Sequence, residues 1–179
     1  MVKKLITQEI VDITKKKFKY TSPDPISLSM VRYYCLAINE KNNIYSNEQT
    51  AIRAGYKTFP VPPTFITETN SFMGGPPGAD GAIAHDWGIN IPGTRYIRGG
   101  NKYLFHDSFY VGDTVTAIYS VENIAEKTSS KNKLLLILSN LIQYFDQDEN
   151  LKCENFETVI FQERLEMWLK TLFLKINSS

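Results

Sequence analysis

The second half of the chain contains a series of segments of strand length, and these limit the fold more than any other feature. Thr114–Ile124 and Cys153–Gln162 alternate between apolar and polar side chains, and Leu134–Phe145 between them is strongly apolar. A fourth candidate strand, Tyr103–Tyr110, precedes them. Turn-forming residues separate the segments at Gly112-Asp113, Ser129–Asn132 and Asp146–Asn150. We therefore predict a four-stranded antiparallel meander, because strands at hairpin spacing usually pair with their neighbours in sequence.

The first half has helical spacing instead. A short helix or lead-in strand is expected within residues 5–17, followed by a short strand at Phe18–Tyr20. A helix capped by Ser27 or Ser29 is predicted to end near Asn39–Asn43. Its apolar positions are Met30, Val31, Tyr34, Cys35 and Ile38.

A second short helix should open at the capping box Ser46-Asn47-Glu48-Gln49 and stop at Gly55. The proline-rich stretch 60–64 then leads into a third apolar stretch, Phe65–Met73. Helices followed by a run of strands indicate an α+β fold.

Length and composition exclude several classes of protein. The chain has 179 residues, which suits one domain, and its net charge of +1 argues against a general nucleic-acid binder. With only two histidines and two cysteines, it cannot form a four-cysteine zinc site, and we expect no metal and no cofactor. We see no signal peptide and no membrane span, so we expect a cytoplasmic protein.

The segment from Gly74 to Gly100 is rich in glycine and proline, and we predict that most of it is a long surface loop. His85-Asp86 within it could be a base with an orienting carboxylate, or simply a solvated pair.

Five motifs follow one another in a recognisable order. They are Val31–Glu40, Asn42–Tyr45 with Ala51–Tyr56, Val61–Phe65, Ile97–His106, and Val111–Asp113. Together they resemble the MaoC-like dehydratases, over roughly residues 17–162. The resemblance implies a single hotdog fold, in which an antiparallel sheet wraps around a central helix, over residues 1–162. Residues 163–179 would form a C-terminal amphipathic helical tail, since apolar residues recur there at helical spacing.

The chain is most similar to the N-terminal, dehydratase-like half domain of this family, in which two hotdogs pair. The resemblance implies a 3-hydroxyacyl-thioester dehydratase or enoyl-thioester hydratase acting on acyl-CoA or acyl carrier protein. Active members carry the pattern Asp-x-Asn-Pro-x-His, but here Glu40 and Tyr45 occupy the Asp and His positions. Tyrosine is a poor base at neutral pH, because its pKa is near ~10. We therefore expect a subunit whose catalytic residues come from a second hotdog, in a heterodimer or homodimer.

The resemblance also assigns substrate-binding positions to Asn42, Pro63, Thr64, Phe65, Gly99 and Gly100. His106 is either a base or a structural histidine at the end of a strand. Lys15–Lys17, Lys131 and Lys133 could meet the phosphates of a CoA or phosphopantetheine, or could be solvated.

Two other functions remain open at this point. The chain could be a non-enzymatic acyl-thioester-binding or scaffold protein. It could also be a hotdog thioesterase in which Glu40 activates water.

Overall fold

The computed structural model describes residues 4–66 and 91–164. Its elements follow in the order α1 (Gln8–Thr14), β1 (Phe18–Thr21), α2 (Leu28–Ala37), the 3-10 helix η1 (Asn43–Tyr45), α3 (Glu48–Arg53), β2 (Thr94–Phe105), β3 (Thr116–Thr128), β4 (Leu134–Phe145) and β5 (Leu151–Glu163). This is an α+β architecture, as predicted. Within the described ranges, no helix has the length and apolar character needed to cross a membrane.

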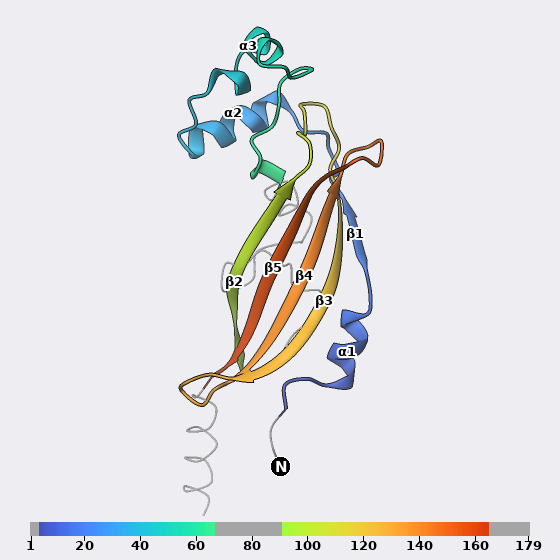
Figure 1. Ribbon diagram of the computed structural model, residues 1–179, viewed down its shortest axis with the longest axis vertical. Coiled ribbons are helices and arrows are strands. Elements are labelled where there is room, and N and C mark those ends of the chain that lie inside the picture. The colour runs from blue at the N-terminus through green and yellow to red at the C-terminus, as the bar shows by residue number, and fades with distance from the viewer. Residues whose placement is uncertain (1–3, 67–90, 165–179) are drawn as a thin grey trace, which may run out of the picture.

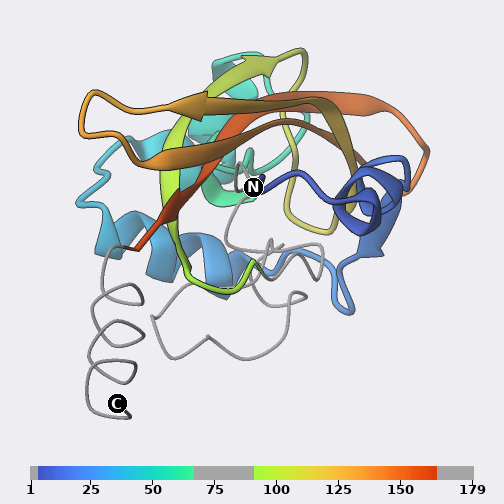
Figure 2. The ribbon, with the colours of Figure 1, turned by 90° about the horizontal axis from the view of Figure 1, so that it is seen from below.

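The five strands form one antiparallel sheet in the order β1-β3-β4-β5-β2 (Figure 1). The strands β3, β4 and β5 are the predicted meander, with bounds close to those expected. The sheet curves strongly. Helices α2 and α3 lie beyond one end of it, and α1 lies beside β3 toward the other end (Figure 1). Seen along the strands, α2 runs across the open side of the curved sheet (Figure 2).

The bounds and the pairing of β2 both differ from the predictions. It runs over Thr94–Phe105, so residues 94–100 are strand rather than surface loop, and residues 106–110 are not the second half of a strand. It also pairs with β5 at the far edge of the sheet, whereas a four-stranded meander would pair it with β3. The glycines of this segment hide its strand character, and only the long register with β5 reveals it.

Side-chain caps begin the helices, as the sequence indicates. The hydroxyl oxygen of Ser27 accepts a hydrogen bond from the backbone N–H of Met30 at the start of α2. Helix α3 begins one residue later than the predicted capping box, because Asn47 rather than Ser46 caps it, through the N–H of Thr50.

The core consists of two apolar clusters on the same face of the sheet. One includes Ile142 and Cys153, and the other includes Leu138 and Val159. A buried polar layer separates them, formed by Asn140, Asn155 and Glu157. The side-chain N–H of Asn140 donates to a Glu157 carboxylate oxygen at 3.2 Å, and Arg98 of β2 lies 3.8 Å from the other carboxylate oxygen.

The predicted central helix lies largely outside the described residues. Of the stretch Phe65–Met73, only Phe65 and Ile66 are described, and both are helical and buried. Of the predicted tail, residues 163–179, Glu163 is instead the last residue of β5, and residues 165–179 lie outside the described residues.

Candidate active site

The end of α2 sets the position of Glu40. Asn39 adopts a left-handed conformation with φ 56°, directly after the last helical turn. Its backbone N–H donates to the carbonyl of Leu36 at 3.2 Å, and the N–H of Glu40 donates to the carbonyl of Cys35 at 2.8 Å. This pair of hydrogen bonds is a Schellman motif, which turns the chain sharply out of the helix.

The carboxylate of Glu40 is engaged by the turn that follows it. One carboxylate oxygen accepts the backbone N–H groups of Lys41 and Asn42, both at 2.8 Å. Asn42 in turn begins η1, since its side-chain oxygen accepts the N–H of Ile44 at 3.2 Å. The side chains of Glu40 and Asn42 thus both hydrogen-bond to the backbone of the turn that follows α2.

Tyr45, at the end of η1, is half-buried and packs against the apolar cluster. Burial raises the pKa of its phenol, and the nearby Tyr56 and Glu40 raise it further. A phenol whose pKa lies above the ordinary value of 10 stays protonated at neutral pH, so Tyr45 cannot take a proton there.

The proline-rich stretch before the central helix is tied to α2. The Tyr34 hydroxyl lies 2.6 Å from the Thr64 hydroxyl oxygen, and the Tyr34 ring packs edge-on against Phe65 with 5.3 Å between centroids. Phe65 is 3% exposed and belongs to the apolar cluster, while Pro63 and Thr64 are exposed. The structure therefore joins Thr64 and Phe65 to the helix that leads to Glu40.

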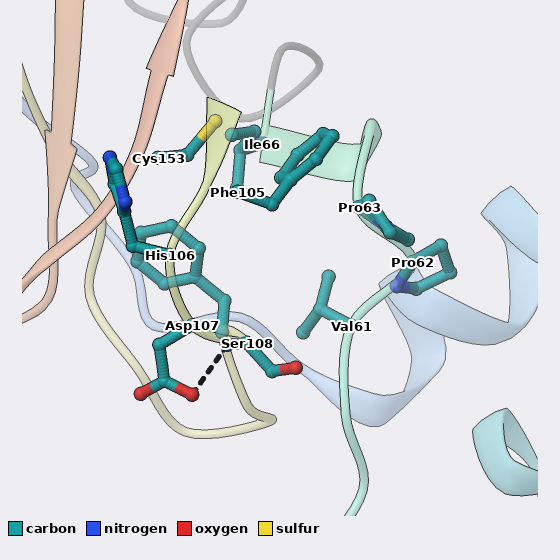
Figure 3. Close-up of a pocket in the computed structure, with 10 residues that line it drawn as sticks. Val61, Pro62, Pro63, Ile66, Phe105, His106, Asp107, Ser108 and Cys153 are labelled. Carbon is teal, nitrogen blue, oxygen red and sulfur yellow. Dashed lines mark hydrogen bonds between the residues drawn. The ribbon is translucent and has the colours of Figure 1, made fainter. Parts of the chain in front are cut away.

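A pocket of about 260 Å³ lies between this stretch and the end of β2 (Figure 3). It is lined by Val61, Pro62, Pro63 and Ile66 on one side and by Phe105–Phe109 with Cys153 on the other. Of the predicted substrate-binding residues, Pro63 lines this pocket. Burial raises the pKa of the Cys153 thiol to about 12, so this sulfur is not a nucleophile at neutral pH.

His106 lines the same pocket, but its ring contacts Glu154, which is not one of the residues that line the pocket. Its Nε2 atom lies 3.0 Å from a carboxylate oxygen of Glu154, and its backbone N–H donates to the carbonyl of Lys152. These contacts support the structural alternative for His106, since they anchor the end of β2 to β5.

An ion cluster that the sequence did not indicate contacts the pocket through one of its members, Asp107. The Lys152 ammonium lies 2.5 Å from a carboxylate oxygen of Asp107 and 3.2 Å from one of Asp146. Asp107 lines the pocket, whereas Lys152 and Asp146 are buried. Lys152 and Cys153 are adjacent and both buried, and this break in the alternation of β5 is seen only in the structure, because the charges look solvated in the sequence.

The other predicted positions lie apart from this pocket. Gly99 and Gly100 are in the middle of β2, at a β-bulge against β5, and Gly99 packs closely on Thr158. Lys15–Lys17 line a groove of about 440 Å³ beside Ser120–Ile124 of β3. His85-Asp86 lies outside the described residues. The site therefore gathers Glu40, Asn42 and Tyr45 on one segment, joined through α2 to Thr64 and Phe65.

Comparison with known proteins agrees with this architecture. A model of the family described as "FAS1-like, dehydratase domain region" matches residues 14–154. A UPF0336 protein from Thermobifida fusca (strain YX) is 27% identical over 124 residues, which cover 68% of this chain and 76% of that relative.

Solved structures show the same fold. A chain of the ChsH1-ChsH2 complex from Mycobacterium tuberculosis has a TM-score of 0.69 at 17% identity, covering 84% of this chain and 87% of that one. The (R)-hydratase from A. caviae involved in PHA biosynthesis has a TM-score of 0.58 at 17% identity, covering 80% and 92%.

The fold is therefore that of the MaoC-like hotdog dehydratases, which confirms the predicted fold class. The chain belongs to the FAS1-like dehydratase-region family.

Proposed function

We propose that the chain is a subunit of a 3-hydroxyacyl-thioester dehydratase, or enoyl-thioester hydratase, that pairs with a second hotdog bearing the catalytic Asp and His. The observation that carries this proposal is the state of the two family positions. Tyr45 is a phenol, which is protonated at neutral pH and whose pKa burial raises further, and a Glu40 carboxylate oxygen accepts two backbone N–H groups.

The reaction explains why these positions matter. Dehydration removes a proton from C2 of the acyl group and a hydroxide from C3, which leaves with a proton as water. It needs a group that accepts the C2 proton, a group that protonates the leaving hydroxyl, and donors for the thioester oxygen. Tyr45 cannot accept a proton at neutral pH, so a base from the partner subunit completes the set.

The two edges of the sheet differ in a way that supports pairing. The edge at β3 is covered, because β1 pairs with it and a Glu126 carboxylate oxygen accepts the backbone N–H of Leu5 at 2.6 Å. At the other edge, the twelve-residue strand β2 pairs with β5 alone within residues 4–66 and 91–164, and Leu104 and Phe105 on it are exposed apolar residues. Open strands of this length are templates for pairing with another chain.

The experiment compares the purified chain alone with the chain mixed with a hotdog protein that has an intact Asp-x-Asn-Pro-x-His pattern. Both samples receive a crotonyl thioester, and hydration is followed by the loss of enoyl absorbance. We expect activity only in the mixture. Replacing the partner's Asp or His should abolish it.

Other outcomes would distinguish the alternatives. Activity of the chain alone that is lost in Glu40→Gln or Tyr45→Phe would contradict the need for a partner. Release of free thiol would indicate a thioesterase. Thioester binding without turnover in any mixture would indicate a binding or scaffold protein.

A further inference from the structure

Strand β4 is apolar on both of its faces. Its inner positions, from Leu136 to Tyr144, are buried in the two apolar clusters and in the polar layer between them. Its outer positions are only half-buried and include no charged side chain: Leu135, Ile137, Ser139, Leu141 and Gln143. An antiparallel strand with one face in water usually has polar residues on that face, whereas a continuous apolar run is typical of a strand covered on both sides. The sequence of β4 therefore indicates that the outer face of the sheet is covered.

The neighbouring strands extend this apolar surface. Ile137 of β4 pairs with Ile160 of β5, and Ile160 pairs with Ile97 of β2, so three isoleucines form a row across the outer face. Further along the same two strands, Leu141 of β4 pairs with Phe156 of β5, whose side chain is 40% exposed. These five residues are called the outer apolar patch. Large apolar groups gathered on a surface indicate that another segment or molecule packs there.

The described residues leave the outer apolar patch without a helix against it. Within residues 4–66 and 91–164, α2 runs across the inner, open side of the curved sheet, α3 lies beyond its end and α1 lies beside β3 (Figure 1, Figure 2). Ile66 and Ile91, which flank residues 67–90, are buried in the inner apolar clusters. The chain therefore leaves and rejoins the described residues there on the inner side of the sheet. A cover for the outer face is expected from the C-terminal segment or from a second molecule.

The C-terminal segment, residues 165–179, has the sequence and the length to be that cover. Apolar residues recur in it at helical spacing: Leu165, Trp168, Leu169, Leu172, Phe173 and Ile176. A helix of this length is about 22 Å long, and the outer face between Gln162 and Phe156 of β5 spans about 20 Å. The segment also starts close to the patch, because β5 runs to Glu163 and the backbone N–H of Arg164 donates to the carbonyl of Gly93 at 2.8 Å.

We propose that residues 165–179 form a helix that folds back over the outer face of the same chain and packs its apolar side on the outer apolar patch. Attachment directly after β5 favours this segment over a second copy, because a tethered group has an effective concentration of roughly millimolar order. The packing removes Ile137, Phe156 and Ile160 from water, and it closes the face on which another sheet would otherwise stack. This inference does not depend on the proposed function, since it needs neither a substrate nor a partner subunit.

Trp168 lies within the proposed helix and reports its burial. The chain has two tryptophans, so Trp87→Phe leaves Trp168 as the single one. In this background, we expect Trp168 of the full chain to emit at short wavelength and to resist quenching by acrylamide at every protein concentration tested. Light scattering on the same samples gives the mass of the particle.

Three variants in the same background locate the contact. Phe156→Asp places a charge in the outer apolar patch, and Phe173→Asp places one on the apolar side of the proposed helix without altering the sheet. The control is Leu36→Asp, which makes the same change at an exposed apolar residue of α2, away from the patch. We expect the first two variants to shift the emission of Trp168 to longer wavelength and to increase its quenching, and Leu36→Asp to change neither. Circular dichroism checks that the sheet is intact in each variant.

Several results would overturn the inference. Trp168 as exposed as in the unfolded chain would show that the segment does not pack. Burial of Trp168 that Phe156→Asp leaves unchanged, or that Leu36→Asp reduces equally, would place the segment on another surface. Burial that appears only as concentration and particle mass rise would show that a second copy covers the patch. None of these results bears on the dehydratase activity, which is measured separately.

Discussion

Lys152 joins separate segments of the chain through two ion pairs. It lies buried between Asp146, which is also buried, and Asp107, which reaches the pocket. Burial works to lower the pKa of Lys152, but its hydrogen bonds with Asp107 and Asp146 outweigh this and leave the pKa raised. The charged form is therefore the stable form, as expected for a buried ion that is paired on both sides.

We predict that Lys152→Met destabilises the fold by about 3 kcal/mol, because it leaves the Asp146 carboxylate buried without its counter-charge. Urea unfolding measures the change. The exposed Lys127→Met serves as the control and should change stability by less than about 0.5 kcal/mol. An equal effect of the two substitutions would show that the buried cluster contributes nothing specific.

The same cluster makes a prediction about pH. The hydrogen bond from Lys152 holds the pKa of Asp107 below its ordinary value of 3.8. Burial of Asp146 works to raise its pKa, but hydrogen bonds from Asn150 and Lys152 lower it overall. A carboxylate whose pKa is depressed by folding adds stability above the unfolded pKa and loses it as the pH falls through the folded value.

The stability difference between the unaltered chain and Asp146→Asn should therefore be largest near neutral pH and shrink below about pH 4. Urea unfolding at a series of pH values tests this. A difference that stays constant from pH 7 to pH 3 would contradict the role assigned to the ionised carboxylate.

At the scale of elements, the Schellman motif that ends α2 determines where Glu40 lies. Asn39 holds φ at 56°, a conformation that costs a residue with a Cβ about 1 kcal/mol, and less for Asn or Gly. We predict that Asn39→Gly keeps or raises stability, while Asn39→Ala lowers it by about 1 kcal/mol. Thermal unfolding of the two variants checks the order, and the reverse order would show that the motif does not require this conformation.

Strand β2 depends on the absence of a side chain at Gly99. A Cβ built there would lie 2.8 Å from Cγ2 of Thr158 on β5, closer than packed carbon atoms approach. Gly99→Ala should therefore destabilise the protein by about 2 kcal/mol, and Thr158→Ser in the same chain should recover part of this loss. A double-mutant cycle on unfolding free energies measures the coupling, and strict additivity would contradict the contact.

At the scale of the whole molecule, the edge at β2, which is open among the residues the structure describes, is the surface that the proposed pairing would use. We predict that Leu104→Asp weakens association with a second hotdog subunit by about tenfold or more, while the monomer remains folded. Lys19→Asp on the short strand β1, at the opposite edge of the sheet, is the control. Light scattering after size exclusion measures association. Equal effects of the two variants would show that the interface is not formed by β2.

Much of the fold follows from local patterns that can be read without a structure. The alternation in Thr116–Thr128 and Leu151–Glu163, and the caps at Ser27 and Asn47, act over a few residues. The motif that places Glu40 and Tyr45 on one turn is also local, so its departure from the Asp-x-Asn-Pro-x-His pattern is visible in the sequence.

Tertiary structure alone decides where β2 pairs and which charged groups meet, because both features join residues that are far apart in the chain. The place of β2 beside β5 depends on a register with a strand some 60 residues later, and its glycines carry no pattern that shows it. The Lys152 cluster joins three segments whose charges look solvated in sequence. The sequence by itself indicated most of the elements and the positions at which this chain departs from the Asp-x-Asn-Pro-x-His pattern. Only the packed sheet decided which edge is open, what lines the pocket and where the charges lie.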